Sequence, residues 1–143
     1  MIFMATTKIS AEKTASEITT ILSRSGLVKF IQLEYDAEIV VGISFIIMVA
    51  DRRIPFKLPA RIEPVLQAMI KDKKTPRSLC YKDQARRVAW RQLLRWIQAQ
   101  MAMVEIGMAD IKEIFMPYLI VSNGVTLYES LEKKQFLIAY EKD

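Results

Sequence analysis

Apolar residues recur at every third or fourth position in three stretches of the chain, residues 10–24, 60–74 and 82–106. This spacing places them along one face of an α-helix. Ser10 is suited to cap the first helix, and Gly107 stands where a left-handed residue would end the third. The pattern therefore predicts three helices, the last of them the longest. The inward positions of the second are Ile62, Val65, Leu66, Met69 and Ile70.

Three stretches between the first two helices have the composition of β-strands, namely residues 27–35, 38–50 and 54–59. The second is apolar on one side and half apolar on the other, which is typical of a strand in the middle of a sheet. Its apolar side consists of Val41, Ile43, Phe45, Ile47 and Val49. Pro55 cannot donate a ladder hydrogen bond, so the third strand is predicted at an edge. We expect a three-stranded antiparallel meander with helices on one face.

Shorter elements follow the long helix. Residues 109–115 have the pattern of two helical turns, and residues 118–122 have that of a short strand that leads into an Asn-Gly turn. Thr126 and Glu129 have the spacing of a capping box and predict a last helix that runs through residue 140.

The whole chain is predicted to be a single α+β domain over residues 1–143. Its 143 residues, 52 % of them hydrophobic, suffice for one buried core. The meander is expected to be packed by the N-terminal helix, the short helix and the long helix, with the strand, turn and helix at the C-terminal end. Residues 1–9 lack a periodic pattern and are the part expected to be flexible. The longest apolar run, residues 39–50, is too short to span a bilayer, so we expect a cytoplasmic protein without membrane contact.

Composition restricts the possible chemistry. The chain contains no histidine and one cysteine, Cys80, which excludes Ser-His-Asp and Cys-His nucleophiles and the usual zinc sites. Its four glycines are scattered, so no glycine-rich phosphate loop is present. We therefore expect no enzyme, no cofactor and no metal site.

The long helix is predicted to separate its tryptophans from its arginines. On a helical wheel, Trp90 and Trp96 fall on a broad apolar arc and should pack in the core. The side chains predicted on the opposite, solvent-exposed face are Arg87, Arg91 and Arg95, which rise about 6 Å per step along the helix. Arg86 projects into the apolar arc, so it should either pair with a carboxylate from elsewhere in the chain or reach water at the helix start.

Positive charge is concentrated in one part of the chain. The net charge is +5, and residues 71–95 alone contain nine Lys or Arg against two Asp. Such a cluster is typical of an anion-binding footprint. The candidate nucleic-acid-binding residues are Arg87, Arg91, Arg95, Lys73, Lys74, Arg77 and Lys82, with Arg52 and Arg53 from the turn before the third strand. The open alternatives are a solvated surface, or arginines paired with the acidic C-terminal third.

The segment "RVAWRQLLRWIQAQMAMVEIGMADIKEIFMPYLIV" (87–121), followed by "TLYE" (126–129), resembles small uncharacterised proteins of bacteriophages and mobile elements. The resemblance extends over "EYDAEIVVGISF" (34–45) and "IPFKLPARIEPVL" (54–66). It implies a phage or mobile-element context, and no established activity or functional residues come with it.

The order of helix, three antiparallel strands and helix is also similar to the double-stranded RNA-binding domain, and a meander backed by a long helix resembles the core of phage single-strand annealing proteins. The chain departs from the first of these at "PARIEPVL" (59–66), where Arg61 is the only cation and Glu63 lies beside it. Its basic cluster comes instead at the end of that predicted helix.

These observations predict a non-enzymatic nucleic-acid-binding accessory protein of phage or mobile-element origin, of the recombination or replication type, that contacts the phosphates of DNA or RNA. The alternative is a protein-interaction module, such as an inhibitor of a host defence nuclease or a subunit of a larger complex, whose basic face docks on an acidic protein surface. A homo-oligomer is compatible with both hypotheses. Either protein would act in the cytoplasm of the host cell.

Overall fold

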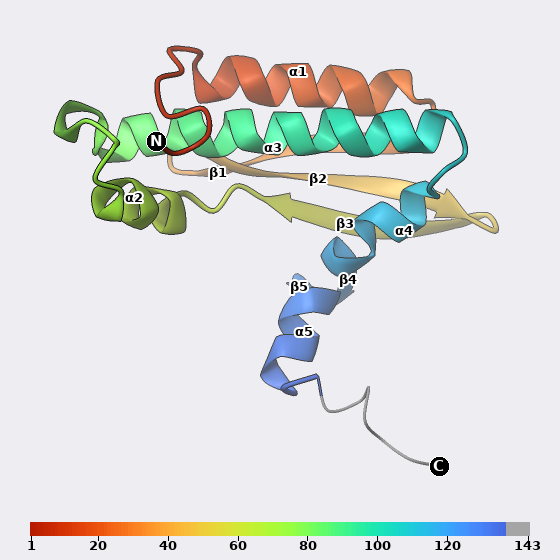
Figure 1. Cartoon of the computed structure of the whole chain (residues 1–143). Coiled ribbons are helices and arrows are strands. Elements are labelled where there is room, and N and C mark those ends of the chain that lie inside the picture. Colours follow the sequence, from red (N-terminus) through yellow and green to blue (C-terminus); the bar gives the residue numbers. More distant parts are fainter. Residues whose placement is uncertain (137–143) are drawn as a thin grey trace.

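The computed structural model describes residues 1–136 and has two layers. The helices α1 (Ala11–Arg24) and α3 (Lys82–Glu105) lie side by side on one face of an antiparallel sheet, as Figure 1 shows. The two helices run parallel, because Thr14 of α1 contacts Arg91 of α3, and later residues of both helices line one hollow further along. The predicted α+β class is confirmed, as are helices on one face of the sheet.

The sheet has the strand order β1-β2-β3, with β1 at Val28–Asp36, β2 at Ile39–Val49 and β3 at Arg52–Pro59. The predicted meander is therefore confirmed, with β2 in the middle and the strand that contains Pro55 at an edge. The turn between β1 and β2 lies at the same end as the start of α3, because the indole N–H of Trp90 donates to the carbonyl oxygen of Val40 at 3.2 Å. The turn between β2 and β3 lies at the opposite end (Figure 1).

The alternation in β2 is shifted at its start. Tyr35 pairs with Val40 whereas Glu34 pairs with Gly42, so Val41 is an extra residue in a β-bulge. The bulge turns Val40 into the core, where it is fully buried, and leaves Val41 half-buried. The prediction that Val41 belongs to the buried face is therefore wrong, because a bulge changes the two-residue period that the pattern assumes.

After the bulge, the predicted apolar side chains of β2 contribute to the core. Ile43, Phe45 and Ile47 are at most 3 % exposed and face the two long helices. The buried side chains that these helices contribute include Ile18 and Leu22 from α1 and Trp90, Leu94 and Ile97 from α3. Trp96 is partly buried and packs against the same core, so both tryptophans lie on the dry side of α3, as predicted.

A second, smaller core lies where α2 (Ile62–Lys71) packs on the first half of α3, around Met69 and Val88. Four of the five predicted inward positions of α2 contribute to it, but Ile70 is 43 % exposed because the helix ends one residue later.

Residues 1–9 close this core from outside. The side-chain amide of Gln84 donates to the carbonyl oxygens of Ala5 and Thr7 at 2.8 and 2.9 Å, and that of Gln92 donates to the carbonyl oxygen of Phe3 at 2.8 Å. The segment, which has no pattern in the sequence, thus makes specific contacts with α3.

Residues 111–136 form a C-terminal arm, and Figure 1 shows its later part, with β4, β5 and α5, projecting from the two layers. Its elements are α4 (Ile111–Phe115), β4 (Ile120–Ser122), β5 (Val125–Thr126) and α5 (Leu127–Lys133). Phe115 anchors the arm, because it is fully buried and its ring lies 5.0 Å from that of Phe45 and 5.9 Å from that of Trp96. Leu119 then bridges to Phe56 on the outer edge of β3.

The predicted capping box opens α5. A side-chain oxygen of Glu129 accepts hydrogen bonds from the backbone N–H and the hydroxyl of Thr126, and these bonds lower the pKa of the Glu129 carboxyl. The helix ends at Lys133, and Gln135 and Phe136 have positive φ angles. The predicted continuation through residue 140 is therefore wrong for residues 134–136, and its remainder lies outside the described residues.

We expect Phe115→Ala to lower the free energy of unfolding by about 3–5 kcal/mol, since it leaves a cavity among three aromatic rings. Chemical denaturation followed by tryptophan fluorescence measures this loss. Met116→Ala is the control, because Met116 is the next residue and is 53 % exposed. An equal effect of the two substitutions would contradict the anchoring role.

We expect the start of α5 to lose stability in acid. The pKa of Glu129 is lower in the folded chain than its ordinary value of 4.5, so the contribution of the carboxylate is fully present above that value and is lost as the pH falls through the folded pKa. Side-chain titration by NMR should give a midpoint below 4.5 for Glu129. In Glu129→Gln, the acid-induced change in the chemical shift of the Thr126 amide should disappear. A midpoint at or above the ordinary value would refute this role.

Candidate nucleic-acid interface

Exposed cations gather where α2 passes into α3, at one end of the two layers (Figure 1). The segment between these helices contains a short 3₁₀ turn, Arg77–Leu79. We call this surface the basic end, and it consists of the exposed side chains of Lys71, Lys73, Lys74, Arg77 and Lys82. Of the predicted contact residues, the structure thus brings Lys73, Lys74, Arg77 and Lys82 together.

The loop that carries these cations is built around Asp72. The carboxylate of Asp72 accepts a hydrogen bond from the hydroxyl of Thr75 at 2.6 Å and another from the backbone N–H of Lys74 at 3.2 Å. The hydrogen bond from Thr75 is the main reason why the pKa of Asp72 is lowered. Thr75 is 4 % exposed, and its hydroxyl oxygen also accepts from the backbone N–H of Ile2. The acid within the loop therefore shapes the backbone, while the lysines around it point to solvent.

The first arginines of α3 are engaged with their own helix. A guanidinium nitrogen of Arg86 lies 2.6 Å from a carboxylate oxygen of Asp83, and the side chain is 17 % exposed. Arg86 thus pairs with a carboxylate as predicted, but the partner belongs to the first turn of the same helix and not to another part of the chain. Arg87 is half-buried and donates to the side-chain oxygens of Gln84 and Tyr81 at 2.9 and 3.3 Å.

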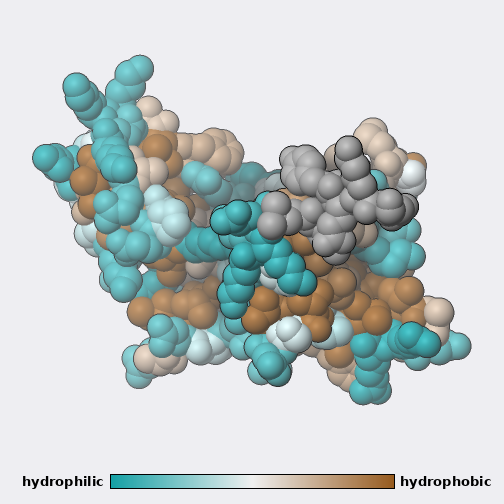
Figure 2. Space-filling model, turned by 90° about the horizontal axis from the view of Figure 1, so that it is seen from below, coloured by the Kyte–Doolittle hydropathy of each residue, from teal (hydrophilic) through white to brown (hydrophobic). Residues whose placement is uncertain are grey.

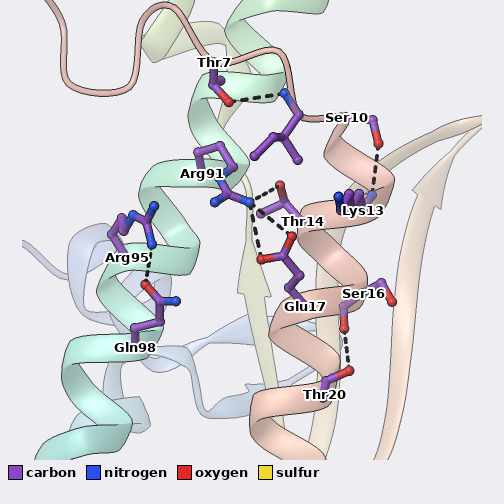
Figure 3. Close-up of polar contacts among 11 residues, drawn as sticks. Thr7, Ser10, Lys13, Thr14, Ser16, Glu17, Thr20, Arg91, Arg95 and Gln98 are labelled. Atoms are coloured by element: carbon purple, nitrogen blue, oxygen red, sulfur yellow. Dashed lines mark hydrogen bonds and ion pairs between the residues drawn. The ribbon is translucent and has the colours of Figure 1, made fainter.

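Arg91 lies between the two long helices, as Figure 3 shows. It is 6 % exposed, and one guanidinium nitrogen lies 3.2 Å from a carboxylate oxygen of Glu17 and 3.3 Å from the hydroxyl of Thr14. The prediction that Arg91 faces solvent is wrong. The helical wheel allows α3 one dry face toward the sheet, but α1 lies beside α3 and covers a second face.

The predicted row of three arginines is therefore interrupted at its middle. Arg95 is exposed and donates to the side-chain oxygen of Gln98 at 2.8 Å (Figure 3), whereas Arg91 is shielded by α1. Arg52 and Arg53 are exposed too, but they are the first residues of β3, next to the β2–β3 turn and at the end of the sheet away from the basic end. The structure does not bring these two arginines to the cluster.

Lys71 belongs to the basic end but not to the predicted contact residues. The sequence contains a signal for Lys71, because this residue occupies the last turn of a helix that leads into a lysine-rich loop. The same end of the sheet also holds Asp36 and Glu38, at the turn between β1 and β2. The predicted contact residues that the structure brings together thus lie on the α2–α3 connection and at the start of α3, whereas Arg52, Arg53 and Arg95 are exposed elsewhere.

No protein-family model, curated protein or solved structure matches the chain. Among the described residues, no helix is both long and apolar enough to cross a membrane. Within residues 1–136, no group of three or more Cys, Asp or Glu side chains is placed to hold a metal ion.

We expect Arg91→Ala to lower the free energy of unfolding by about 1–3 kcal/mol, because it removes charge-assisted hydrogen bonds between α1 and α3. Arg95→Ala, four residues later on the same helix, should change it by less than about 0.5 kcal/mol. Thermal and urea denaturation of both variants measure the difference. If Arg91→Ala were as stable as Arg95→Ala, the guanidinium would not be a structural contact.

Proposed function

We propose that the chain is a non-enzymatic nucleic-acid-binding protein that holds the phosphate backbone at its basic end. The observation that carries this proposal is the gathering of five exposed cations, three on the short connection between α2 and α3 and one at each helix end that it joins. The acids nearby do not balance these cations, because Asp83 pairs with Arg86 and the remaining Asp72 adds one negative charge against five positive charges. Clustered cations of this kind release condensed counterions when they meet a polyanion.

The packing of α3 favours contacts with the phosphate backbone of the nucleic acid over contacts that read its base sequence. A recognition helix must leave one face free to enter the major groove. Here the sheet, α1, α2 and residues 1–9 surround the first half of α3. Tyr81, 47 % exposed, is the only aromatic side chain on the segment from Lys71 to Lys82 that could stack on a base. Binding that depends on phosphates is nearly independent of sequence.

The arrangement of α1 and α3 supports a duplex ligand. The helix that lies beside α1 on the sheet is α3, and α2 precedes it in the chain. The basic residues therefore precede and open the second helix of the pair. In this respect the order of elements is similar to that of the double-stranded RNA-binding domain, and "PARIEPVL" (59–66) belongs to the start of α2 instead. The carboxylates of Asp36 and Glu38, on the turn between β1 and β2, repel phosphate groups. The proposed contact is therefore limited to the basic end.

We expect the triple variant Lys73→Gln/Lys74→Gln/Lys82→Gln to bind short duplexes at least about tenfold more weakly than the unchanged chain at low salt. Each phosphate contact contributes about 0.9 to the slope of log affinity against log salt, so the slope should fall by roughly two to three. Fluorescence anisotropy with duplex and single-stranded DNA and RNA at several salt concentrations measures both quantities.

The matched control removes three exposed lysines elsewhere, Lys29, Lys133 and Lys134, and so changes the net charge equally. Equal weakening by the two triple variants would mean that total charge, and not the basic end, drives binding. No binding of any oligonucleotide at low salt would overturn the proposal and favour an acidic protein surface as the partner.

A further inference from the structure

The face of the sheet opposite to α1 and α3 is open where β2 ends and β3 begins. The C-terminal arm leaves this face from the edge of β3, as Figure 1 shows. Figure 2 looks onto the open face and shows hydrophobic residues between hydrophilic ones. The register places Lys29, Ile46 and Pro55 side by side in one row of this face, and Met48 beside Arg53 in the next row. All of these side chains except the half-buried Ile46 are exposed.

A β-bulge adds an aromatic ring to the open face. The register shifts between Lys29 and Gln32, so Phe30 and Ile31 together oppose one residue of β2. Ile31 packs against the core, whereas Phe30 is 63 % exposed and has a φ angle of +52°. Strict alternation after Lys29 would have buried the ring, and a positive φ angle costs free energy for an aromatic residue. Such strained positions are concentrated at functional sites.

The ring of Phe30 meets a side chain from the far edge of the sheet. Arg53 lies on β3, and its guanidinium is 4.8 Å from the centre of the Phe30 ring, so the contact spans the middle strand. The guanidinium covers one side of the ring, and the large exposure of Phe30 leaves the other side accessible. We call this surface the platform, and it consists of Lys29, Phe30, Ile46, Met48, Arg53 and Pro55.

Positive charge surrounds the platform. Lys29, Arg52 and Arg53 are exposed at this end of the sheet, and Asp51 is the exposed acid of the adjacent turn. None of these three cations forms an ion pair within residues 1–136. Three positive charges against one negative charge suit a polyanion. Arg52 and Arg53 are also the predicted contact residues that lie away from the basic end.

The other acids near the open face are paired or lie at its opposite end. Asp110, which lines one hollow together with Met48, pairs with Lys112 at 3.7 Å. Glu34 accepts a hydrogen bond from the hydroxyl of Ser44 at 2.6 Å and lies toward the β1–β2 turn. The open face is therefore positive at the platform and acidic at its other end.

We propose that the platform binds a single strand of nucleic acid. An unpaired base stacks on the accessible side of Phe30, and Arg52 and Arg53 hold the phosphates on either side of that base. A duplex keeps its bases stacked on one another, so they do not reach a flat surface of this kind. The class of ligand rests on the proposed function, but the site is separate from the basic end.

The two sites lie at opposite ends of the sheet. The eight residues of β3 span roughly 26 Å, and the platform is at their start. One chain therefore holds a duplex at the basic end and a single strand at the platform without competition between them.

Tryptophan fluorescence tests the platform directly. Phe30→Trp places an indole on the platform, whereas Trp90 is fully buried and Trp96 partly buried in the unchanged chain. We expect single-stranded oligothymidylate to quench the added fluorescence and a duplex of the same length to leave it unchanged. The matched control is Tyr35→Trp, at the other end of β1, where the natural side chain is 56 % exposed and no quenching is expected.

Affinities are measured in the background of Lys73→Gln/Lys74→Gln/Lys82→Gln, so that the basic end does not contribute. There, Phe30→Ala should weaken binding of the single strand at least about fivefold, whereas Phe30→Tyr should retain it. Arg52→Gln/Arg53→Gln should lower the slope of log affinity against log salt by about 1.4, at about 0.7 for each contact with a single strand. Circular dichroism should show the same helix content in all variants.

The absence of quenching in Phe30→Trp, equal quenching by a duplex, or an unchanged affinity in Phe30→Ala overturns the proposal. Binding of polyglutamate in place of the oligonucleotide, lost in Arg52→Gln/Arg53→Gln, also overturns it and identifies an acidic protein as the partner. If a single strand binds the platform but no duplex binds the basic end, the proposed function of the basic end fails and the platform stands.

Discussion

The packing of α3 against three neighbours at once is the constraint on which the remaining structure depends. Trp90, Leu94 and Ile97 face the sheet, and all three are fully buried. On its flanks, α3 meets α1 through Arg91 and meets α2 and residues 1–9 around Val88 and Gln84. Because so much of the first half of α3 is enclosed, the exposed cations of that half are confined to its start, and Arg95 lies beyond it. The position of the exposed cations is thus a result of helix packing as much as of sequence.

Elements whose signals are local could be predicted from the sequence. The capping box at Thr126 and Glu129 and the edge position of Pro55 depend on hydrogen bonds that a few residues make or lack, and both were confirmed. The burial of Val40 and Arg91 could not be predicted in this way. Val40 depends on a bulge whose partner residues lie on β1, and Arg91 depends on a helix more than seventy residues earlier in the chain.

The residues of the candidate site fall into the same two groups, those whose exposure follows from the local sequence and those whose position depends on distant parts of the chain. Lys73, Lys74 and Arg77 lie in a loop where neighbouring helices do not cover them, so counting charges sufficed to place them at the surface. Arg52 and Arg53 were assigned to the same interface by charge alone. The meander itself argues against that assignment, because successive turns of a meander lie at opposite ends of the sheet. The turn after β2 and the connection after β3 are therefore separated by the length of a strand.

The buried pair of Arg91 and Glu17 constrains the geometry of the two helices more than it adds to stability. Removing an arginine from water costs several kcal/mol, so the hydrogen bonds to Thr14 and Glu17 leave only a small net gain after they offset that cost. The Nε atom of Arg91 is also buried without a partner among the described residues. One guanidinium nitrogen nevertheless contacts both Thr14 and Glu17, which are one helical turn apart on α1. A shift of α1 by one turn along α3 would break this arrangement and bury an unpaired charge, so the pair selects one register for the two parallel helices. That register determines where the end of α1 meets the end of α3, and with it the shape of the hollow that Leu27 and Val104 line.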